Sequence, residues 1–354
     1  MKDTTPFLID RATGIRAALK HLDRNAKGIL FVIDSSGILV GSLTDGDVRR
    51  WILAEGALDE QADKVCNANP QFVLESFDIE TVRRMMTEAK IDCIPVLDRE
   101  RHIVDLLFTD DAFGETASVR PKRALDIPVV IMAGGKGSRL APFTHILPKP
   151  LIPIGDKTVL ELIIAKFLEH QVGRFSLCVH HKSKIIISYL EELNPPYSID
   201  YSFEDKPLGT AGGLKHLRDR IGDRFLVTNC DIIIDADFPE IAAFHEQAKN
   251  EITVVASLKG FSIPYGVCEI SNGGSLTKID EKPELTFLVN TGMYILETRV
   301  LDLIPSDEPF DMTDLIAAVK KGGGKVGVFP IHENSWIDVG EWGSYKKAVE
   351  VLSL

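Results

Sequence analysis

The chain lacks the features that mark secreted and membrane proteins. Its first residues, MKDTTPFLIDR, contain no apolar signal-peptide core, and no apolar run approaches the length of a membrane-spanning helix. The five cysteines are scattered and form no pairs with metal-site spacing, so we expect free thiols in a reducing compartment. We therefore expect a cytoplasmic protein with no membrane partner.

Basic residues are also scarce. The chain has 40 Lys and Arg against 52 Asp and Glu, a formal net charge of −12. A nucleic-acid partner requires a basic footprint, so we expect none, although an acidic protein can still bind a nucleotide in a locally basic pocket. With 354 residues, 45% of them hydrophobic, the chain is long enough for two domains with ample core.

The most informative stretch is residues 127–153, IPVVIMAGGKGSRLAPFTHILPKPLIP. The apolar run at 129–133 predicts a buried parallel strand, and glycines directly after such a strand let backbone N–H groups reach a phosphate. A Walker A loop would need Ser or Thr at Gly137, and a Rossmann fingerprint would need Gly at Leu140, so neither fits. A glycine turn beside a solvated Lys and Arg is the plain alternative.

The whole pattern, G-G-x-G-x-R-L-x-P-x-T-x-x-x-P-K-P, resembles the sugar-1-phosphate nucleotidyltransferases, and further blocks continue the resemblance to the C-terminus. The resemblance implies that the glycine loop and Arg139 hold a nucleoside triphosphate. It also implies that Lys149 reaches the reacting phosphates, and its flanking prolines restrict the backbone that carries it. The implied loop residues are Gly134, Gly135, Gly137 and Ser138.

Residues 1–118 contain an internal repeat. The segments 30–47 and 93–111 both predict a strand, an Asp-led turn, a second strand and a helix, and each follows a helical stretch at 15–22 or 79–89. The repeat resembles a tandem pair of CBS domains. That family's G-x-x-T-x-x-D signature, which contacts an adenine nucleotide, is present as Gly41, Thr44 and Asp47. The second copy departs from it, with Asp105 for Gly and Phe108 for Thr, so a scaffold or dimerisation module without ligand is the alternative.

Residues 119–126 are polar, basic and proline-containing, which is typical of an interdomain linker. From 127 to 354, strands at 129–133, 175–179, 199–203 and 225–228 alternate with helices at 159–170, 185–193 and 211–221. This alternation predicts βαβ crossovers with ligands at the carboxyl ends of the strands. The predicted fold is α/β: a Rossmann-like nucleotidyltransferase domain with a mixed, mainly parallel sheet, preceded by an α+β CBS pair.

The loop P-L-G-T-A-G-G at 207–213 lies at a strand-to-helix junction. In the resembled family this loop binds the nucleobase, which makes Gly209 and Thr210 nucleotide-binding residues. Its sequence is most similar to that of the family members that use GTP; UTP, CTP and dTTP are the alternative nucleotides. The plain alternative is a loop in which Thr210 caps a helix. Glu204 is a candidate partner for a base N–H, or a solvated carboxylate.

Two acidic residues are candidates for Mg²⁺ binding. Asp231 follows a strand at its carboxyl end, where a carboxylate suits a Mg²⁺ that also binds phosphate oxygens. The resemblance supplies a second carboxylate, Asp338, from the block W-I-D-V-G. On its own, Asp338 would be a turn residue. The two are about a hundred residues apart and can meet only through tertiary folding.

The segment between these acids carries β-type runs at 253–258, 267–270 and 287–296. The resemblance makes it a sugar-binding lobe, in which Lys282 of E-K-P binds the sugar phosphate; a plain surface lysine is the alternative. The implied sugar-binding residues are Tyr265, Gly266, Glu281, Asn290 and Thr291. The adjacent His180 and His181 point to opposite faces, so we interpret them as structural rather than chelating.

The resemblance therefore implies an enzyme, a nucleotidyltransferase that transfers the nucleotidyl group of an NTP, with GTP favoured, to a sugar 1-phosphate and releases pyrophosphate. By analogy it would supply bacterial surface glycans or nonulosonic acids, with glucosamine, mannose or heptose 1-phosphates as candidate substrates. We also expect a homo-oligomer. The alternative is a non-catalytic, nucleotide-sensing regulatory subunit, which would be marked by loss of the key lysine or an aspartate.

Overall fold

The computed structural model describes residues 3–25, 27–113 and 122–352. The chain divides into two compact units, Met1–Arg120 and Pro121–Leu354. Of the expected linker, residues 119–121 lie outside the described part. Lys122 is tied to the second unit by ion pairs with Glu169 and Asp235 at 2.6 and 3.1 Å. No helix in the described ranges is long and apolar enough to cross a bilayer.

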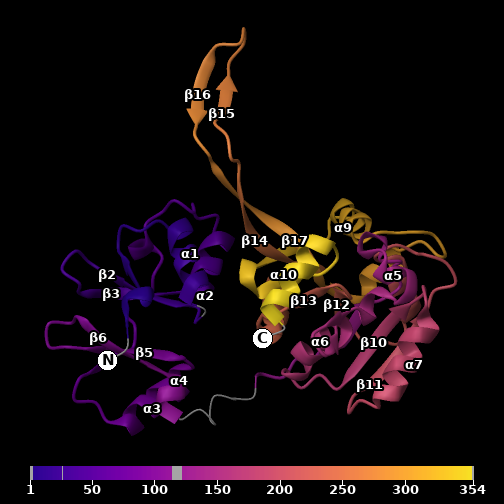
Figure 1. Cartoon of the computed structure of the whole chain (residues 1–354), viewed down its shortest axis with the longest axis horizontal. Helices are drawn as coiled ribbons and strands as arrows, with labels where there is room; N and C mark the ends of the chain where they lie inside the picture. Colours follow the sequence, from indigo (N-terminus) through magenta and orange to yellow (C-terminus); the bar gives the residue numbers. More distant parts are fainter. Residues whose placement is uncertain (1–2, 26, 114–121, 353–354) are drawn as a thin grey trace. The chain divides into compact units, whose positions relative to one another are not determined.

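The first unit repeats one pattern of strand, helix, strand, strand and helix (Figure 1). Its first copy comprises β1 (Leu8–Asp10), α1 (Ile15–Asn25), β2 (Ile29–Ile33), β3 (Leu39–Thr44) and α2 (Asp45–Leu53). The second comprises β4 (Val73–Leu74), α3 (Ile79–Ala89), β5 (Cys93–Leu97), β6 (Ile103–Phe108) and α4 (Thr109–Phe113). In each copy the first strand pairs in parallel with the second, which forms an antiparallel pair with the third. The predicted repeat is confirmed.

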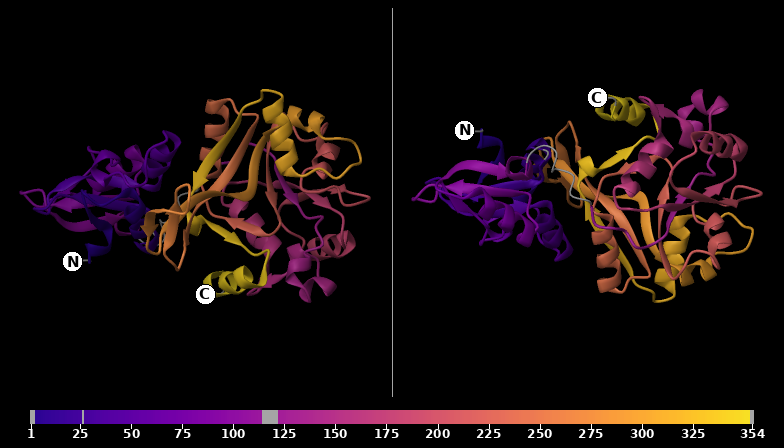
Figure 2. Two further views of the ribbon diagram at one scale, coloured as in Figure 1. Left: turned by 90° about the horizontal axis from the view of Figure 1, so that it is seen from above. Right: turned by 90° about the horizontal axis from the view of Figure 1, so that it is seen from below.

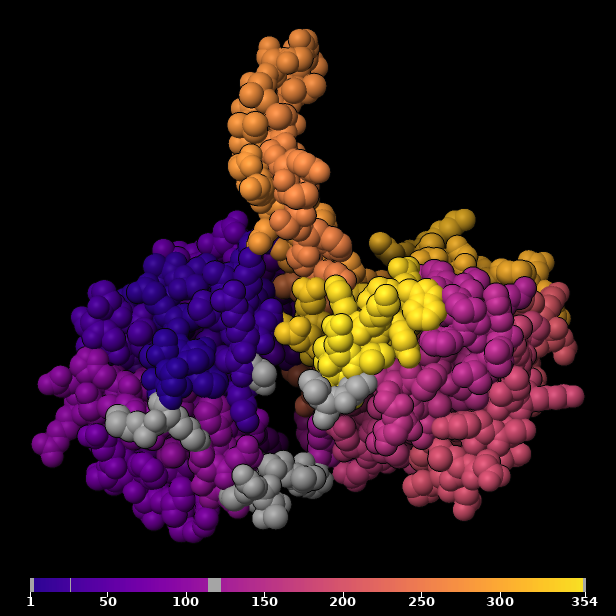
Figure 3. All heavy atoms as spheres, in the orientation of Figure 1, coloured from indigo at the N-terminus to yellow at the C-terminus, as the bar shows by residue number. Residues whose placement is uncertain are grey.

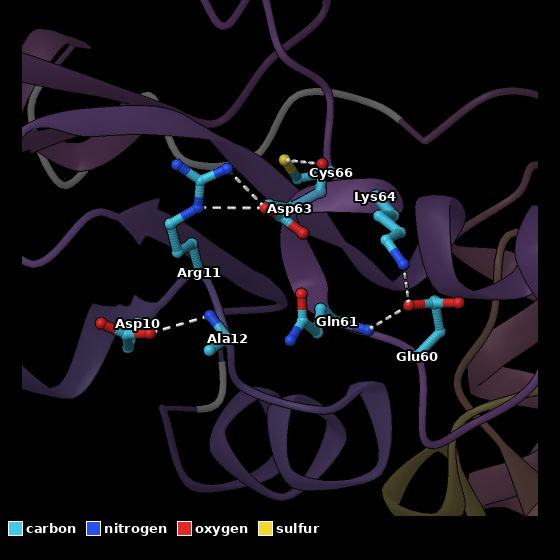
Figure 4. Close-up of polar contacts among 8 residues, drawn as sticks. All are labelled: Asp10, Arg11, Ala12, Glu60, Gln61, Asp63, Lys64 and Cys66. Carbon is cyan, nitrogen blue, oxygen red and sulfur yellow. Dashed lines mark hydrogen bonds and ion pairs between the residues drawn. The ribbon is translucent and has the colours of Figure 1, made fainter.

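Apolar side chains from both copies share one small core, composed of Phe31, Leu39, Cys93, Leu97 and Leu106. Each copy also has its own core, because one face of each sheet is covered by that copy's helices. The segment that joins the copies is fastened to the first by Arg11, whose guanidinium donates to Asp63 at 3.0 and 2.7 Å (Figure 4). Asp63 lies in the short 3₁₀ helix η2 (Ala62–Lys64).

A seven-stranded sheet forms the centre of the second unit, with the order β11-β10-β7-β12-β17-β14-β18. The strands are β7 (Val129–Met132), β10 (Arg174–Val179), β11 (Ser198–Phe203), β12 (Arg224–Asn229), β14 (Ile252–Ser262), β17 (Glu284–Glu297) and β18 (Val326–Ile331). β17 is antiparallel to both neighbours, whereas the other neighbouring pairs are parallel. The predicted mixed, mainly parallel sheet is confirmed.

Helices cover both faces of this sheet (Figure 2), and a separate apolar core lies under each layer. One layer contains α6 (Val159–Leu168), α7 (Ser183–Leu193), α8 (Phe238–Ala248) and α10 (Trp342–Leu352), and the other contains η6 (Gly212–Leu217), η7 (Thr298–Leu303) and α9 (Met312–Lys321). The helix expected at 211–221 is instead the short 3₁₀ helix η6. Gly212 and Gly213 open this segment, and glycine is a poor α-helix former.

Shorter elements complete the unit at the edge where the parallel strands end. They are η4 (Ser138–Leu140), α5 (Phe143–Ile146), η5 (Lys149–Leu151), β8 (Pro153–Ile154), β9 (Lys157–Thr158), β13 (Ile232–Ile234), η8 (Glu333–Ser335) and β19 (Trp336–Asp338). β13 pairs antiparallel with β19, and Ile232 stands opposite Asp338. This pairing joins two segments about a hundred residues apart in the chain.

A two-stranded arm, residues 258–288, extends from the sheet (Figure 1). In the described part of the chain, the pairing of β14 with β18 ends at Ser257, while its pairing with β17 continues to Ser262. Farther out, β15 (Val267–Ile270) and β16 (Leu276–Asp280) form a hairpin. Because β17 is antiparallel to β12, the arm leaves the sheet at the edge where β12 ends.

Candidate active site

Lys149, Asp231 and Asp338 meet around one glycine. The Lys149 ammonium forms an ion pair with the Asp231 carboxylate, and their side chains are 11% and 14% exposed. A Cβ atom placed on Gly340 would lie 2.8 Å from Asp231 Oδ2, 2.9 Å from Asp338 Oδ1 and 3.4 Å from Lys149 Nζ. Gly340 is the member of this cluster to which sequence reasoning assigned no role, although it stands in the W-I-D-V-G block.

Backbone contacts fix the two carboxylates in place. The Val339 N–H donates to the Asp231 carbonyl oxygen at 2.8 Å, which extends the β13–β19 pairing by one step. The Gly340 N–H donates to Asp338 Oδ1 at 2.7 Å and so orients that side chain. Two partly buried carboxylates held side by side form a donor set suited to a divalent cation.

Cys230 precedes Asp231 and is buried. Burial, with a smaller contribution from the charge of Asp231, raises the pKa of its thiol to about 12. The thiol is therefore protonated at neutral pH, and only the thiolate is a good nucleophile. Cys230 is consequently not poised for covalent catalysis.

The glycine loop lies directly against Lys149. Gly137 has φ +66°, and a Cβ there would lie 2.9 Å from Lys149 Cβ, so a larger residue would displace the lysine. A Cβ on Gly135 would meet nothing within 4 Å, which leaves this part of the backbone open. Ser138 begins η4, and Arg139 is 64% exposed and pairs with Glu341 at 2.9 Å.

Glu204 lies at the other end of this loop. The residue is only 8% exposed, and its carboxylate lies against Gly134 and Gly213 and accepts from the Leu208 N–H at 3.3 Å. Burial raises the pKa of this carboxyl. His180 holds the same strand end, because its Nδ1 lies 2.8 Å from the Glu204 carbonyl oxygen and must carry a proton to donate to it. This His180 contact is a structural one.

Gly209 and Thr210 are attached to the start of α9 rather than to η6. The Thr210 N–H and hydroxyl both contact Asp311 Oδ1, at 2.9 and 3.2 Å, and its hydroxyl accepts from the Met312 N–H. Gly209 has φ +79°, and a Cβ there would lie 2.7 Å from the Phe310 carbonyl oxygen. The Thr210 hydroxyl therefore accepts from the first N–H of α9, a contact that no local sequence pattern predicts.

The expected sugar-binding residues fall into two groups. Asn290 donates to the Tyr294 hydroxyl at 2.7 Å, and Thr291 donates to the Val255 carbonyl at 2.8 Å, both where β17 joins the sheet. The next residue, Gly292, lies against the side chain of Asn229. Asn229 is two positions before Asp231 in the chain.

The second group, Tyr265, Gly266, Glu281 and Lys282, lies on the arm. The Lys282 N–H donates to the Tyr265 carbonyl at 3.3 Å, and a Cβ on Gly266 would lie 3.0 Å from a Glu281 carboxylate oxygen. Lys282 stands ten positions before Gly292, which corresponds to about 30 Å of extended strand. The structure thus brings these four residues together but does not bring them to Asp231.

In the first CBS copy, Thr44 and Asp47 form a capping box on α2. The Asp47 carboxylate accepts from the Thr44 N–H at 2.9 Å, and Thr44 Oγ1 accepts from the Asp47 N–H at 3.3 Å. Gly41 is required by close packing, since a Cβ there would lie 2.6 Å from both Cys66 Sγ and the Asn67 carbonyl oxygen. Local structure therefore accounts for all three signature residues.

Comparison with known proteins agrees with this architecture. The family model for nucleotidyl transferase matches residues 128–353, and the CBS domain model matches residues 3–54 and 62–113. A UTP–glucose-1-phosphate uridylyltransferase of Synechocystis is 31% identical over 63% of this chain and 63% of its own length. A mannose-1-phosphate guanyltransferase of Yarrowia lipolytica is 36% identical over 49% of this chain and 50% of its own. The chain thus spans between half and two thirds of these relatives.

Among solved structures, HddC from Yersinia pseudotuberculosis aligns with a TM-score of 0.51 and 27% identity, covering 64% of this chain and 99% of HddC. HddC complexed with GMP-PN aligns with a TM-score of 0.50 and 26% identity. The family match covers well over half of the chain and includes the clustered residues Lys149, Asp231, Asp338 and Gly340. The chain therefore belongs to the nucleotidyl transferase family, with two CBS domains preceding its nucleotidyltransferase part.

Proposed function

We propose that the chain transfers a nucleotidyl group from an NTP, with GTP favoured, to a sugar 1-phosphate and releases pyrophosphate. The observation that carries the proposal is the meeting of Lys149, Asp231 and Asp338 beside the glycine loop. The family match and the relatives named above, which act on glucose 1-phosphate and mannose 1-phosphate, support the same chemistry.

In the proposed reaction, an oxygen of the sugar phosphate attacks the α-phosphorus of the NTP. The bond from the α-phosphorus to the oxygen shared with the β-phosphorus breaks, and pyrophosphate leaves with that oxygen. No covalent enzyme intermediate is required, so the protein contributes positioning and charge neutralisation. Lys149 would stabilise charge at the reacting phosphates, and Arg139 would release Glu341 to hold the leaving pyrophosphate.

The N–H groups of the loop formed by Gly134, Gly135, Gly137 and Ser138 would bind the triphosphate. Gly135 suits this role because the space beside its Cα is open: a Cβ placed there would meet nothing within 4 Å. Asp231 and Asp338 would hold a divalent cation, Mg²⁺ in our proposal, which when bound supplies positive charge to the phosphate oxygens. Enzymes of this family generally use a divalent metal, and the paired carboxylates fit one.

Glu204 favours guanine among the four bases. Guanine presents two adjacent donors, N1–H and N2–H, to which a carboxylate can offer two oxygens. Uracil and thymine offer a single N–H flanked by two carbonyl oxygens, which an anionic group repels. Gly209 and Thr210 would form the neighbouring wall of the base site. The structural neighbour solved with GMP-PN supports this choice.

Lys282 would bind the sugar phosphate, and Tyr265, Gly266, Glu281, Asn290 and Thr291 would contact the sugar. We further propose an adenine nucleotide at Gly41, Thr44 and Asp47, and domain boundaries at 1–118, 119–126 and 127–354. The CBS matches at 3–54 and 62–113 and the nucleotidyl transferase match at 128–353 support this division.

The test is a pyrophosphate-release assay on the purified full chain. Four NTPs are combined with glucose, mannose, glucosamine, N-acetylglucosamine and heptose 1-phosphates in the presence of Mg²⁺. We expect turnover with GTP and one or two of the sugar phosphates, and none when the sugar phosphate is omitted. Absence of turnover with every combination would overturn the proposal and favour a regulatory subunit.

A further inference from the structure

The arm, residues 258–288, exposes an unusual amount of apolar surface. Eight large apolar side chains on it are between 41% and 74% exposed: Phe261, Tyr265, Ile270, Leu276, Ile279, Leu285, Phe287 and Leu288. Together they leave on the order of 800 Å² in the solvent, since a large side chain presents about 200 Å² when fully exposed. This area matches what one partner buries in a specific protein–protein interface, about 800 Å².

The exposed residues are arranged in an amphipathic pattern at the arm's end. Cys268 stands opposite Ile279, and Ile270 opposite Leu276, on one face of the hairpin. The opposite face carries Glu269 and Lys278 as a cross-strand pair, and Lys278 is bonded to Asp280 at 2.6 Å. An isolated two-stranded hairpin is marginally stable in water, so an apolar face on it requires a partner surface.

The arm also carries half of the proposed site. Tyr265, Gly266, Glu281 and Lys282 form one cluster about 30 Å of strand away from Gly292. The arm leaves the same sheet edge at which Asp231 lies, and Figure 3 shows it projecting well beyond the rest of the second unit. The ion pair of Lys149 and Asp231 is thus left without the residues proposed to bind the sugar phosphate.

Bending the arm back onto its own site anywhere within residues 258–288 would break its own pairing. The register of β14 and β17 shifts once at the base of the arm, between Val255 and Ala256. From there the strands pair without a break out to Ser262 and Glu284, and the Ile263 N–H then donates to the Pro283 carbonyl at 3.1 Å. The Lys282 N–H continues this ladder to Tyr265. Beyond the bulge no unpaired break interrupts the ladder among the described arm residues, so the arm is one continuous ribbon.

We propose that the arm docks on a second copy of this chain and completes that copy's site in trans. A twofold axis makes the exchange mutual, so each site combines Lys149, Asp231 and Asp338 of one chain with Glu281 and Lys282 of the other. The apolar face around Ile270 and Ile279 is buried in the same interface. This inference rests on the proposed function for the role of Lys282, but its interface is testable without activity.

The decisive experiment separates the two halves of the site on two full-length chains. One chain carries Lys282→Ala and the other Asp231→Asn, with different affinity tags, and the heterodimer is purified on both tags after co-expression. Each single-variant protein should have about 1% of wild-type turnover or less. The heterodimer contains one site with every group intact, so it should regain about half of the wild-type rate per dimer.

If each site were built within one chain, both sites of the heterodimer would be damaged and the rate would stay at the level of the single variants. That result, or failure to recover any heterodimer, would overturn the proposal. Sedimentation of the wild-type chain provides an independent readout. We expect a dimer for the wild type and for the polar-face control Lys278→Asp, and a monomer for the double variant Ile270→Asp, Ile279→Asp.

A wild-type monomer at assay concentration overturns the trans site even if the enzyme is active. Conversely, a dimer that dissociates in the double variant but catalyses no transfer would refute the proposed function and leave the arm interface standing. Circular dichroism and melting temperatures establish that each variant is folded, which is expected because Lys282 and the two isoleucines are exposed.

Discussion

The ammonium of Lys149 pairs with the carboxylate of Asp231, 82 positions away in the chain, and both side chains are largely buried. Asp338 lies beside the pair, so two like charges share a small space with one opposite charge. Without Lys149 the two carboxylates would repel each other at close range. The lysine thus keeps the acidic pair together before any ligand arrives.

Replacing Lys149 by alanine should lower turnover by about a hundredfold or more, because a fixed charge at the reacting phosphates is lost. Pyrophosphate release measures this change, with circular dichroism as the test of folding. The control is Lys157→Ala, which removes an exposed lysine a few residues away and should leave the rate unchanged. Near-normal turnover in Lys149→Ala would refute its catalytic role.

Replacing Gly340 by alanine should lower turnover by about tenfold or more without removing any charged group. The added Cβ would lie 2.8 Å from Asp231 Oδ2 and 2.9 Å from Asp338 Oδ1, so at least one carboxylate must move. Gly343→Ala is the matched control, because a Cβ there meets nothing within 4 Å. Equal rates for the two variants would contradict the geometry proposed for the site.

Replacing Asp338 by asparagine should weaken divalent-cation binding, because one anionic ligand becomes a neutral one. The Mg²⁺ concentration needed for half-maximal rate should rise by about tenfold or more, and calorimetric titration with Mg²⁺ should show the same shift. Asp307→Asn, which changes an exposed aspartate elsewhere, should leave both unchanged. An unaltered Mg²⁺ dependence in Asp338→Asn would exclude this residue as a ligand.

Replacing Glu204 by glutamine should reduce kcat/KM for GTP by about tenfold to a hundredfold, while the low rate with UTP should fall less or rise. The amide offers one acceptor where the carboxylate offers two, and it no longer repels the uracil carbonyls. Rates with the two nucleotides measure the change. Asp205→Asn is the exposed neighbouring control, and an unchanged GTP-to-UTP ratio in Glu204→Gln would count against the base assignment.

Glu204 should also make stability depend on pH. Because burial raises its pKa in the folded state, the ionised form destabilises the fold. The loss of stability begins as the pH rises above 4.5, the ordinary pKa of the carboxyl in the unfolded chain. It is complete once the pH exceeds the raised pKa of Glu204 in the folded protein. Glu204→Gln should therefore melt at a higher temperature than the wild type at pH 7, and the difference should shrink as the pH falls through that folded pKa.

Replacing Thr44 by alanine should destabilise the first unit by about 1 kcal/mol, the usual contribution of an N-cap side chain. Chemical denaturation measures this loss, and Ser36→Ala, at an exposed turn position, is the control. If an adenine nucleotide binds at this copy, AMP, ADP or ATP should raise the melting temperature of the wild type and not of Thr44→Ala. A shift of equal size in both would place the nucleotide elsewhere.

Local sequence determined most of the individual elements. The apolar run after Ile127 formed β7, and the repeated pattern at 30–47 and 93–111 formed the paired strands of both CBS copies, because these signals depend on neighbouring residues alone. The main failure among the helices was 211–221. There, Gly212 and Gly213 weakened the helix, and Thr210 bonded to Asp311 about a hundred residues away instead of capping it.

The sequence by itself therefore determined the family, the two-part organisation and the candidate residues, since each was carried by a contiguous motif. Only the tertiary structure decided which candidates meet. Antiparallel pairing of β13 with β19 brings Asp338 to Asp231, whereas the long antiparallel pairing of β14 with β17 carries Lys282 away from both. Strand pairing joins residues without regard to their separation in the chain, so no local pattern could have foretold either outcome.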